Sequence, residues 1–142
     1  MNIEVRYQSR GGNTKKVAEI IASELGKEAK SIDIPLDKHV DILFLRGGVY
    51  NWTADSELIK FIKHLDRNKV GKIIPFSTTG SFRSAINKIN ECASEQDIPV
   101  SEEFLCIKMM LKGNALIGKK GGVLSEGQEE EVREFVRKIM GR

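Results

Sequence analysis

Segments with a strand-like pattern alternate with segments of helix-like pattern along this 142-residue chain. Ile3, Val5 and Tyr7 open a strand, and residues 41–45 form the short, continuous apolar run expected of a strand buried on both faces. Between them, apolar residues recur at helical spacing over residues 17–25. This alternation predicts a parallel sheet with helices on both of its faces.

The rest of the chain continues the pattern. Further strands are expected near 29–34, over 73–77 and over 100–107, and helices over 58–65, over 85–93 and from residue 125 onwards. Pro75 predicts a bulge or distortion, because proline donates no ladder hydrogen bond and avoids central strands. Gly26 is expected to end the first helix, and residues 125–128, Ser-Glu-Gly-Gln, have the spacing of a capping box.

No internal repeat, linker or low-complexity segment interrupts the pattern, so one domain over residues 1–142 is expected. Right-handed crossovers leave few arrangements for parallel strands. The sequence therefore predicts a doubly wound α/β fold with a five-stranded parallel sheet. In such sheets a ligand lies outside the carboxyl ends of the strands. The ligand site is therefore expected in the loops that follow Tyr7, Arg46, Ser77 and Lys108.

Composition narrows the classes of function. With 40% hydrophobic and 30% charged residues, neither a disordered chain nor a membrane protein is indicated. No apolar run approaches the roughly 20 residues of a membrane span, and the first residues lack the apolar core of a secretory signal, so a cytoplasmic location is expected. The net charge of +3 is dispersed, unlike a nucleic-acid-binding stripe.

The cysteines and histidines stand outside any recognisable motif. Cys92 and Cys106 have neither CxxC spacing nor Cys/His ligand spacing, so reduced core thiols are expected and no metal site is predicted. His39 and His64 are expected to have surface or packing roles.

The first polar loop, residues 8–14, joins a strand to the start of a helix. Its sequence is Gln-Ser-Arg-Gly-Gly-Asn-Thr, and its two glycines let the backbone curl. Free backbone N–H groups and the positive helix end favour an anion. Neither nucleotide-binding glycine motif matches, which favours a single phosphate monoester. On loop composition alone, an ordinary glycine-rich turn with an Asn cap is the alternative.

Residues 7–18, Tyr-Gln-Ser-Arg-Gly-Gly-Asn-Thr-Lys-Lys-Val-Ala, resemble the phosphate-loop segment of flavodoxins. The resemblance extends over residues 41–50 and 76–81, in the same order along the chain. It implies the flavodoxin strand order 2-1-3-4-5 and FMN as the cofactor. It also implies that the phosphate is bound by Ser9, Gly11, Gly12, Asn13 and Thr14, with Arg10 as a further cofactor-binding residue of this loop.

Two further loops are expected to hold the flavin ring. A flat, apolar ring needs aromatic plates, and the second loop brings Tyr50 and Trp52 together. One of these rings packing under the following helix is the alternative. A turning peptide near Asn51-Trp52 is a candidate for tuning the flavin, since Asn tolerates positive φ. The predicted cofactor-binding residues of these loops are Gly48, Val49, Tyr50, Asn51 and Trp52, followed by Thr78, Thr79, Gly80, Ser81 and Phe82.

The third loop departs from the family pattern. Many flavodoxins resemble one another in carrying an Asp and a Tyr in this region, whereas residues 77–82 contain neither. The hydroxyls and amides of this loop are expected to meet the polar edge of the flavin, and Phe82 to cover one ring face. A looser hold on FMN than is usual is therefore expected.

The loop over residues 109–123 contains four glycines and three lysines, Lys112, Lys119 and Lys120. It is expected to leave the sheet on the flavin side. Electron-transfer flavodoxins are typically acidic around this rim, so the basic loop suggests a redox partner protein with an acidic docking face. A solvated surface loop without a special role is the alternative.

The resemblance implies an electron carrier that uses FMN between a reductase and a partner enzyme. The alternatives are an FMN-dependent reductase of a quinone or other small acceptor, and a flavodoxin-like domain without FMN. A receiver domain is disfavoured, because Gln8-Ser9 and Arg46-Gly47 stand where a receiver needs acidic residues. The chain is too short for a separate nicotinamide domain, which favours the carrier.

Overall fold

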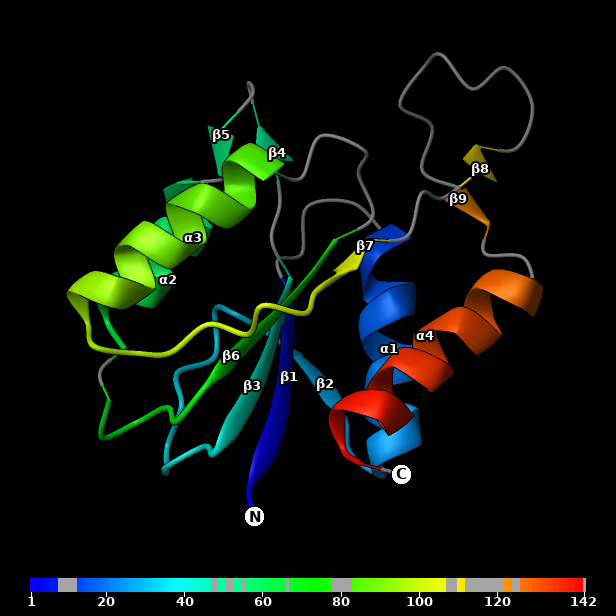
Figure 1. Ribbon diagram of the computed structural model, residues 1–142, viewed down its shortest axis with the longest axis horizontal. Coiled ribbons are helices and arrows are strands. Elements are labelled where there is room, and N and C mark those ends of the chain that lie inside the picture. The colour runs from blue at the N-terminus through cyan, green and yellow to red at the C-terminus, as the bar shows by residue number, and fades with distance from the viewer. Residues whose placement is uncertain are drawn as a thin grey trace.

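The computed structural model describes most of the chain in several stretches. These are residues 1–7, 13–46, 49–50, 53–54, 56–65, 67–77, 83–106, 110–111, 122–123 and 126–141. Within them, the strands of the main sheet lie in the order β2-β1-β3-β6-β7 (Figure 1). Their bounds are β1 Ile3–Tyr7, β2 Ala29–Ser31, β3 Ile42–Arg46, β6 Ile73–Ser77 and β7 Leu105–Cys106. Every neighbouring pair is parallel, so the predicted α/β class with a parallel sheet is confirmed.

Helices cover both faces of this sheet. The pair α1 and α4 lies on one face, and the pair α2 and α3 lies on the other (Figure 1). Their bounds are α1 Asn13–Leu25, α2 Ser56–Lys63, α3 Arg83–Glu95 and α4 Glu126–Ile139. Each helix was expected from its apolar spacing.

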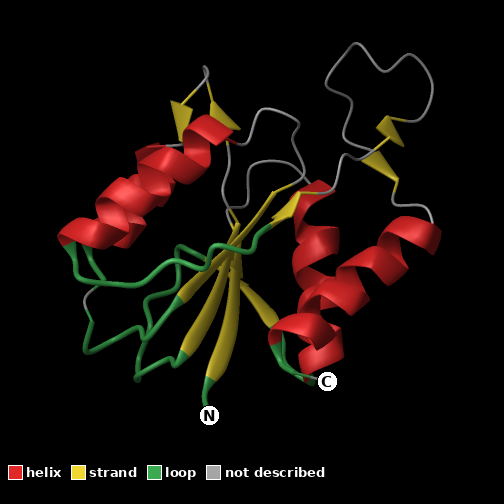
Figure 2. Ribbon diagram, in the orientation of Figure 1, coloured by secondary structure: helices red, strands yellow, loops and turns green. Residues whose placement is uncertain are grey.

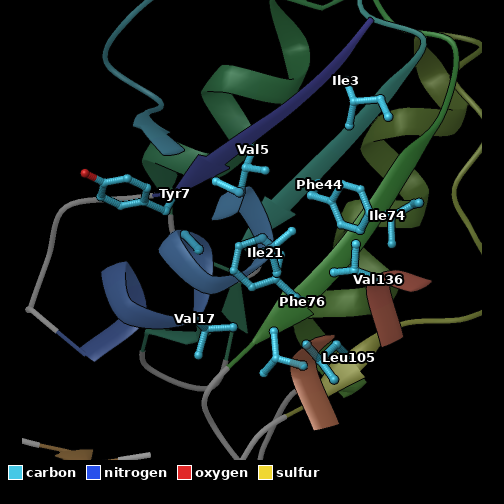
Figure 3. Packing of buried hydrophobic residues seen from close by; sticks show 13 residues of the cluster. Ile3, Val5, Tyr7, Val17, Ile21, Phe44, Ile74, Phe76, Leu105 and Val136 are labelled. Carbon is cyan, nitrogen blue, oxygen red and sulfur yellow. The ribbon is translucent and has the colours of Figure 1, made fainter. Parts of the chain in front are cut away.

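Strand β3 shows how one continuous apolar run serves two cores. Phe44 faces α1 and α4, where it packs with Ile21 and Val136 (Figure 3). Leu43 and Leu45 point the other way, into the core under α2 and α3. All three strand residues are fully buried, because successive side chains of a strand alternate between its faces.

Pro75 lies in a central strand without the predicted bulge. Its register with Leu45 belongs to an unbroken ladder between β3 and β6. Ile73, two residues earlier, points its N–H and C=O toward the other neighbour, where it bonds with residues 99 and 101. Pro75 therefore also points its nitrogen to that side, where residues 102–104 form no strand. The interruption occurs in the neighbouring segment, so no ladder hydrogen bond is lost.

The last strand of the sheet is shorter than the sequence predicts. Val100 forms only an isolated bridge with Ile73, and pairing resumes where Phe76 meets Leu105. The expected strand over 100–107 is thus divided, and its last expected residue, 107, lies outside the described residues.

Gly26 ends α1, as predicted. Its φ is +68°, a left-handed conformation that glycine adopts without a steric penalty. Its N–H donates to the carbonyl of Ser23, and the N–H of Lys27 donates to that of Ala22. This is a Schellman ending, which satisfies carbonyls that the helix leaves open.

Arg6 is a buried charge that the sequence analysis did not anticipate. Its side chain is 2% exposed and lies on the face of β1 opposite to Val5. Nε and Nη2 donate to Oε1 of Glu4 at 3.0 and 2.7 Å. Nη1 donates to the carbonyl of Ser31 at 3.0 Å and to that of Ile34. Arg6 therefore fixes the chain that leaves β2 against the face of β1.

Replacing Arg6 with Met should lower the free energy of unfolding by about 3 kcal/mol, because the Glu4 carboxylate would stay half-buried without its partner. Urea unfolding followed by circular dichroism measures this. The double variant Glu4→Gln/Arg6→Met should regain part of the loss, since the stranded charge is then removed as well. A loss as large in the double variant as in Arg6→Met would contradict the role of the ion pair.

Asp41 anchors the start of the chain at the amino edge of the sheet. The backbone N–H of Asn2 donates to Oδ2 of Asp41 at 2.6 Å, and Nε2 of His39 lies 3.4 Å from Oδ1. The Asn2 hydrogen bond holds the pKa of Asp41 below its ordinary value of 3.8, with His39 adding to the effect and partial burial opposing it. His39 is exposed, as predicted.

Replacing Asp41 with Asn should remove a stabilisation that depends on pH. Because the pKa of Asp41 is lower in the folded chain, its contribution is complete above pH 3.8 and is lost as the pH falls through the lowered value. The thermal midpoint of the wild type should exceed that of Asp41→Asn near neutral pH, and the two should converge in strong acid. Parallel midpoint curves down to the acid limit would show that the interaction does not contribute.

Candidate functional site

The carboxyl ends of three neighbouring strands meet at one edge of the sheet. β1, β3 and β6 end at Tyr7, Arg46 and Ser77, the residues predicted from the sequence. Arg6 pairs with Leu45, so the last residues of β1 and β3 are neighbours too. Because adjacent strands are about 5 Å apart, the segments that follow them start close together. We refer to this border as the carboxyl edge.

Helix α1 begins at this edge at Asn13 and continues for 13 residues. Its first N–H groups have no partner within the helix, and its dipole makes this end positive. The first turn contains no acidic residue and instead carries Lys15 and Lys16. Lys15 lies 3.9 Å from Glu19, one turn further along. The start of α1 is thus a positive end without a carboxylate of its own.

Helix α3 has the same property. It begins at Arg83 after the third predicted loop, and its first turn also lacks an acidic residue. Two helices that follow predicted cofactor loops therefore start without a negative charge.

The second predicted loop contains a short antiparallel hairpin. β4 (Val49–Tyr50) pairs with β5 (Thr53–Ala54), with Tyr50 opposite Thr53. The hairpin lies beside the start of α3, at the carboxyl edge (Figure 1). This pairing makes Asn51 and Trp52 the two residues that connect the strands.

The predicted cofactor residues fall partly within these elements. Asn13 and Thr14 begin α1, and Val49 and Tyr50 form β4. The others lie outside the described residues, and their role stays a prediction: Ser9, Arg10, Gly11, Gly12, Gly48, Asn51, Trp52, Thr78, Thr79, Gly80, Ser81 and Phe82.

Arg46 is a residue of the carboxyl edge that the sequence analysis treated only as the end of a strand. It is half-buried, and it follows Leu45, so strand alternation puts it on the α1 side of the sheet, like Phe44. A cation at the last position of an otherwise apolar strand was the signal available in the sequence.

The predicted basic loop over residues 109–123 is closed by a second small hairpin. β8 (Met110–Leu111) pairs antiparallel with β9 (Gly122–Val123), so the two ends of the connecting segment lie side by side. The lysines at 112, 119 and 120 lie outside the described residues.

Cys92, His39 and His64 lie as predicted in the described residues. Cys92 is a free thiol in the core under α2 and α3, and burial raises its pKa. His64 is exposed at the end of α2, where Nδ1 lies 2.7 Å from the carbonyl of Lys60. Within the described parts of the chain, no three His, Cys, Asp or Glu side chains gather as a metal site would require. The side chain of Cys106 is not described.

A family model described as a flavodoxin domain matches residues 4–115. The chain belongs to the flavodoxin family. The match includes the carboxyl ends of β1, β3 and β6 and the starts of α1 and α3. No curated protein matches the sequence.

Solved flavoprotein structures have the same fold. Oxidised Flavodoxin 2 from Bacillus cereus superposes with a TM-score of 0.68 at 16% identity, covering 99% of both chains. The flavodoxin of Streptococcus pneumonia TIGR4 has a TM-score of 0.61 at 13% identity, and the match again covers 99% of both chains. An NADH:FMN oxidoreductase (EMOB), in its apo form, gives 0.60 at 10% identity, covering 97% of this chain and 88% of its own. At such identities the likeness shows the fold.

No membrane-spanning helix is found in the described stretches of the chain, since none of their helices is sufficiently long and apolar.

Proposed function

We propose that this flavodoxin domain binds FMN at the carboxyl edge and carries electrons between a reductase and a partner enzyme. One observation carries the proposal. The ends of three strands in register lie at one edge, and α1 begins at that edge with no acidic residue in its first turn. A phosphate group needs donors and positive potential at one point, and the start of a helix supplies both.

The charges of α1 support a bound anion. Lys15 and Lys16 lie in its first turn, where a positive side chain opposes the helix dipole. Such an arrangement is unfavourable by itself and becomes favourable when a phosphate is bound nearby. The residues present therefore fit the phosphate of FMN.

The predicted residues of three loops would each contact a different part of the cofactor. Ser9 to Thr14 would bind the phosphate, and Tyr50 and Trp52 would cover the ring from the β4–β5 hairpin. Thr78 to Phe82 would meet the polar edge of the ring. When bound, FMN supplies the one- and two-electron chemistry, while the protein orients it and limits its access to water.

We propose that residues 1–142 form a single domain that acts in the cytoplasm. The similarity to two flavodoxins over 99% of both chains favours the carrier over a self-sufficient reductase. The similarity to an NADH:FMN oxidoreductase is the observation that favours the second candidate, an FMN-dependent reductase of a small acceptor.

The proposed redox partner has an acidic docking face. Lys112, Lys119 and Lys120 belong to the segment that β8 and β9 close, and Figure 1 shows these strands beyond the start of α4, on the same side of the molecule as the carboxyl edge. Opposite charges on two proteins steer their encounter and orient the complex.

Replacing Thr14 with Glu should weaken FMN binding at least tenfold and leave riboflavin, which has no phosphate, almost unaffected. The new carboxylate would oppose the phosphate at the start of α1. The same charge should stabilise the apoprotein by about 0.5 kcal/mol, because it complements the helix dipole. Quenching of flavin fluorescence measures the affinities, and thermal unfolding measures the stability.

Ser23→Glu is the matched control, since it puts the same charge on an exposed position near the other end of α1. It should leave both flavin affinities unchanged. Equal FMN affinity in wild type and Thr14→Glu would overturn the phosphate assignment, whatever the effect on stability.

Stopped-flow mixing of the FMN-loaded protein with NADH or NADPH distinguishes the carrier from the reductase. A carrier should keep its oxidised flavin spectrum over seconds, and bleach only when a separate flavodoxin reductase is added. Rapid bleaching by the nicotinamide alone would favour the reductase.

A further inference from the structure

The connection from β2 to β3 contains no helix. Residues 32–41 are all described, and Figure 2 draws them as loop. A crossover between parallel strands is usually a helix that covers one face of the sheet. Here residues 32–36 cover that face of β1 in its place, and α2 lies next to them.

A groove of about 510 Å³ lies between this segment and α2. Its apolar surface comes from Ile32 and Leu36 on one side and from Phe61 and Leu65 on the other. Ile32 and Leu65 are buried, whereas Leu36 and Phe61 remain half-exposed. We call it the α2 groove. It is large enough to accept an aliphatic side chain from another molecule.

Ile34 stands beside the α2 groove as a fixed apolar projection. Its side chain is 48% exposed, one of three large hydrophobic side chains with such exposure among the described residues. Its backbone carbonyl accepts a hydrogen bond from the buried Arg6, and Pro35 follows it. The loop is thus held in one conformation, so docking through Ile34 would lose little conformational entropy.

The charged side chains Asp33, Glu57, Lys60 and Lys69 line the groove, with the two carboxylates toward one end and Lys69 at the other. Asp33 and Glu57 lie near the carboxyl edge, because Ser31 pairs with Tyr7 and α2 begins beside β5. Lys69 lies at the opposite end, next to the isolated bridge between Val40 and Val70, two residues that precede β3 and β6. The acidic and basic ends are therefore separated along the groove.

We propose that this face associates with a second copy of the chain as a two-fold symmetric dimer. A two-fold axis across the groove brings the acidic end of one copy to the basic end of the other, so the surface is complementary to itself. The same axis lets Ile34 of each copy pack into the α2 groove of its partner. A projection beside a matching groove on one face is what an isologous contact requires.

This proposal is independent of the proposed function. The α2 groove lies on the opposite side of the sheet from α4, near which β8 and β9 are found (Figure 1). Dimer formation therefore leaves the proposed partner surface accessible, and a failure of FMN binding would not affect the test below.

Sedimentation velocity from low micromolar to submillimolar protein tests the contact. The wild type should show a reversible monomer–dimer equilibrium, and Ile34→Asp should raise its dissociation constant about tenfold or more. Phe104→Asp is the matched control, because Phe104 is also a large exposed side chain (44%) but lies next to β7, on another edge of the sheet. A wild type that stays monomeric throughout, or equal effects of the two variants, would overturn the proposal.

A charge exchange tests the two-fold geometry. Lys69→Asp should weaken the dimer because both ends of the groove become acidic. Asp33→Lys should weaken it because the new cation offsets Glu57, so the acidic end loses its net charge. The double variant Asp33→Lys/Lys69→Asp should regain part of the association, since the cation introduced at position 33 then faces the carboxylate introduced at position 69 of the other copy. Lys63→Asp, on α2 but outside the groove, controls for net charge. A double variant weaker than both single variants would exclude this arrangement.

Discussion

The shared register of β1, β3 and β6 is the constraint on which the rest of this structure depends. Their ladders are unbroken, so their last residues, Tyr7, Arg46 and Ser77, lie at one edge. A slip of one residue would turn Phe44 away from α1 and α4, and it would move the charge of Arg46 to the face covered by α2 and α3. The packing of both cores therefore also determines where the loops of the candidate site begin.

Much of the fold could be predicted because its signals are local. Apolar spacing located the four helices, and Gly26 marked a helix end through a conformation that glycine adopts easily. The packing of Arg6 could not be predicted in this way. Its carbonyl partners are 25 and 28 residues away in the sequence and carry no side-chain signature. When a polar residue alternates with apolar ones in a strand, the pattern predicts that its side chain is exposed to solvent. The sequence pattern does not show which distant segment covers that side chain.

Pro75 shows how a correct local rule led to a wrong structural expectation. Proline does lack the ladder donor, and a central position does require one in general. The rule takes no account of which neighbour the missing donor would face, and here it faces the interruption before β7.

The position of the candidate site could be predicted from the sequence, but the contacts of its side chains could not. Its position follows from topology, whereas the contacts of individual loop side chains depend on backbone conformations that spacing does not encode.

The charges at the starts of the four described helices distinguish two kinds of helix. α2 and α4 carry Glu57 and Glu126 in their first turns, which neutralise the positive helix ends within the protein. α1 and α3, which follow the two polar loops, have no such residue, and each carries a basic side chain there instead. Helix stability alone would favour acids at all four positions. The starts of α1 and α3 therefore keep a positive potential that no carboxylate of their own first turns neutralises. Under the proposed function, these two ends would face the phosphate and the polar edge of the flavin ring.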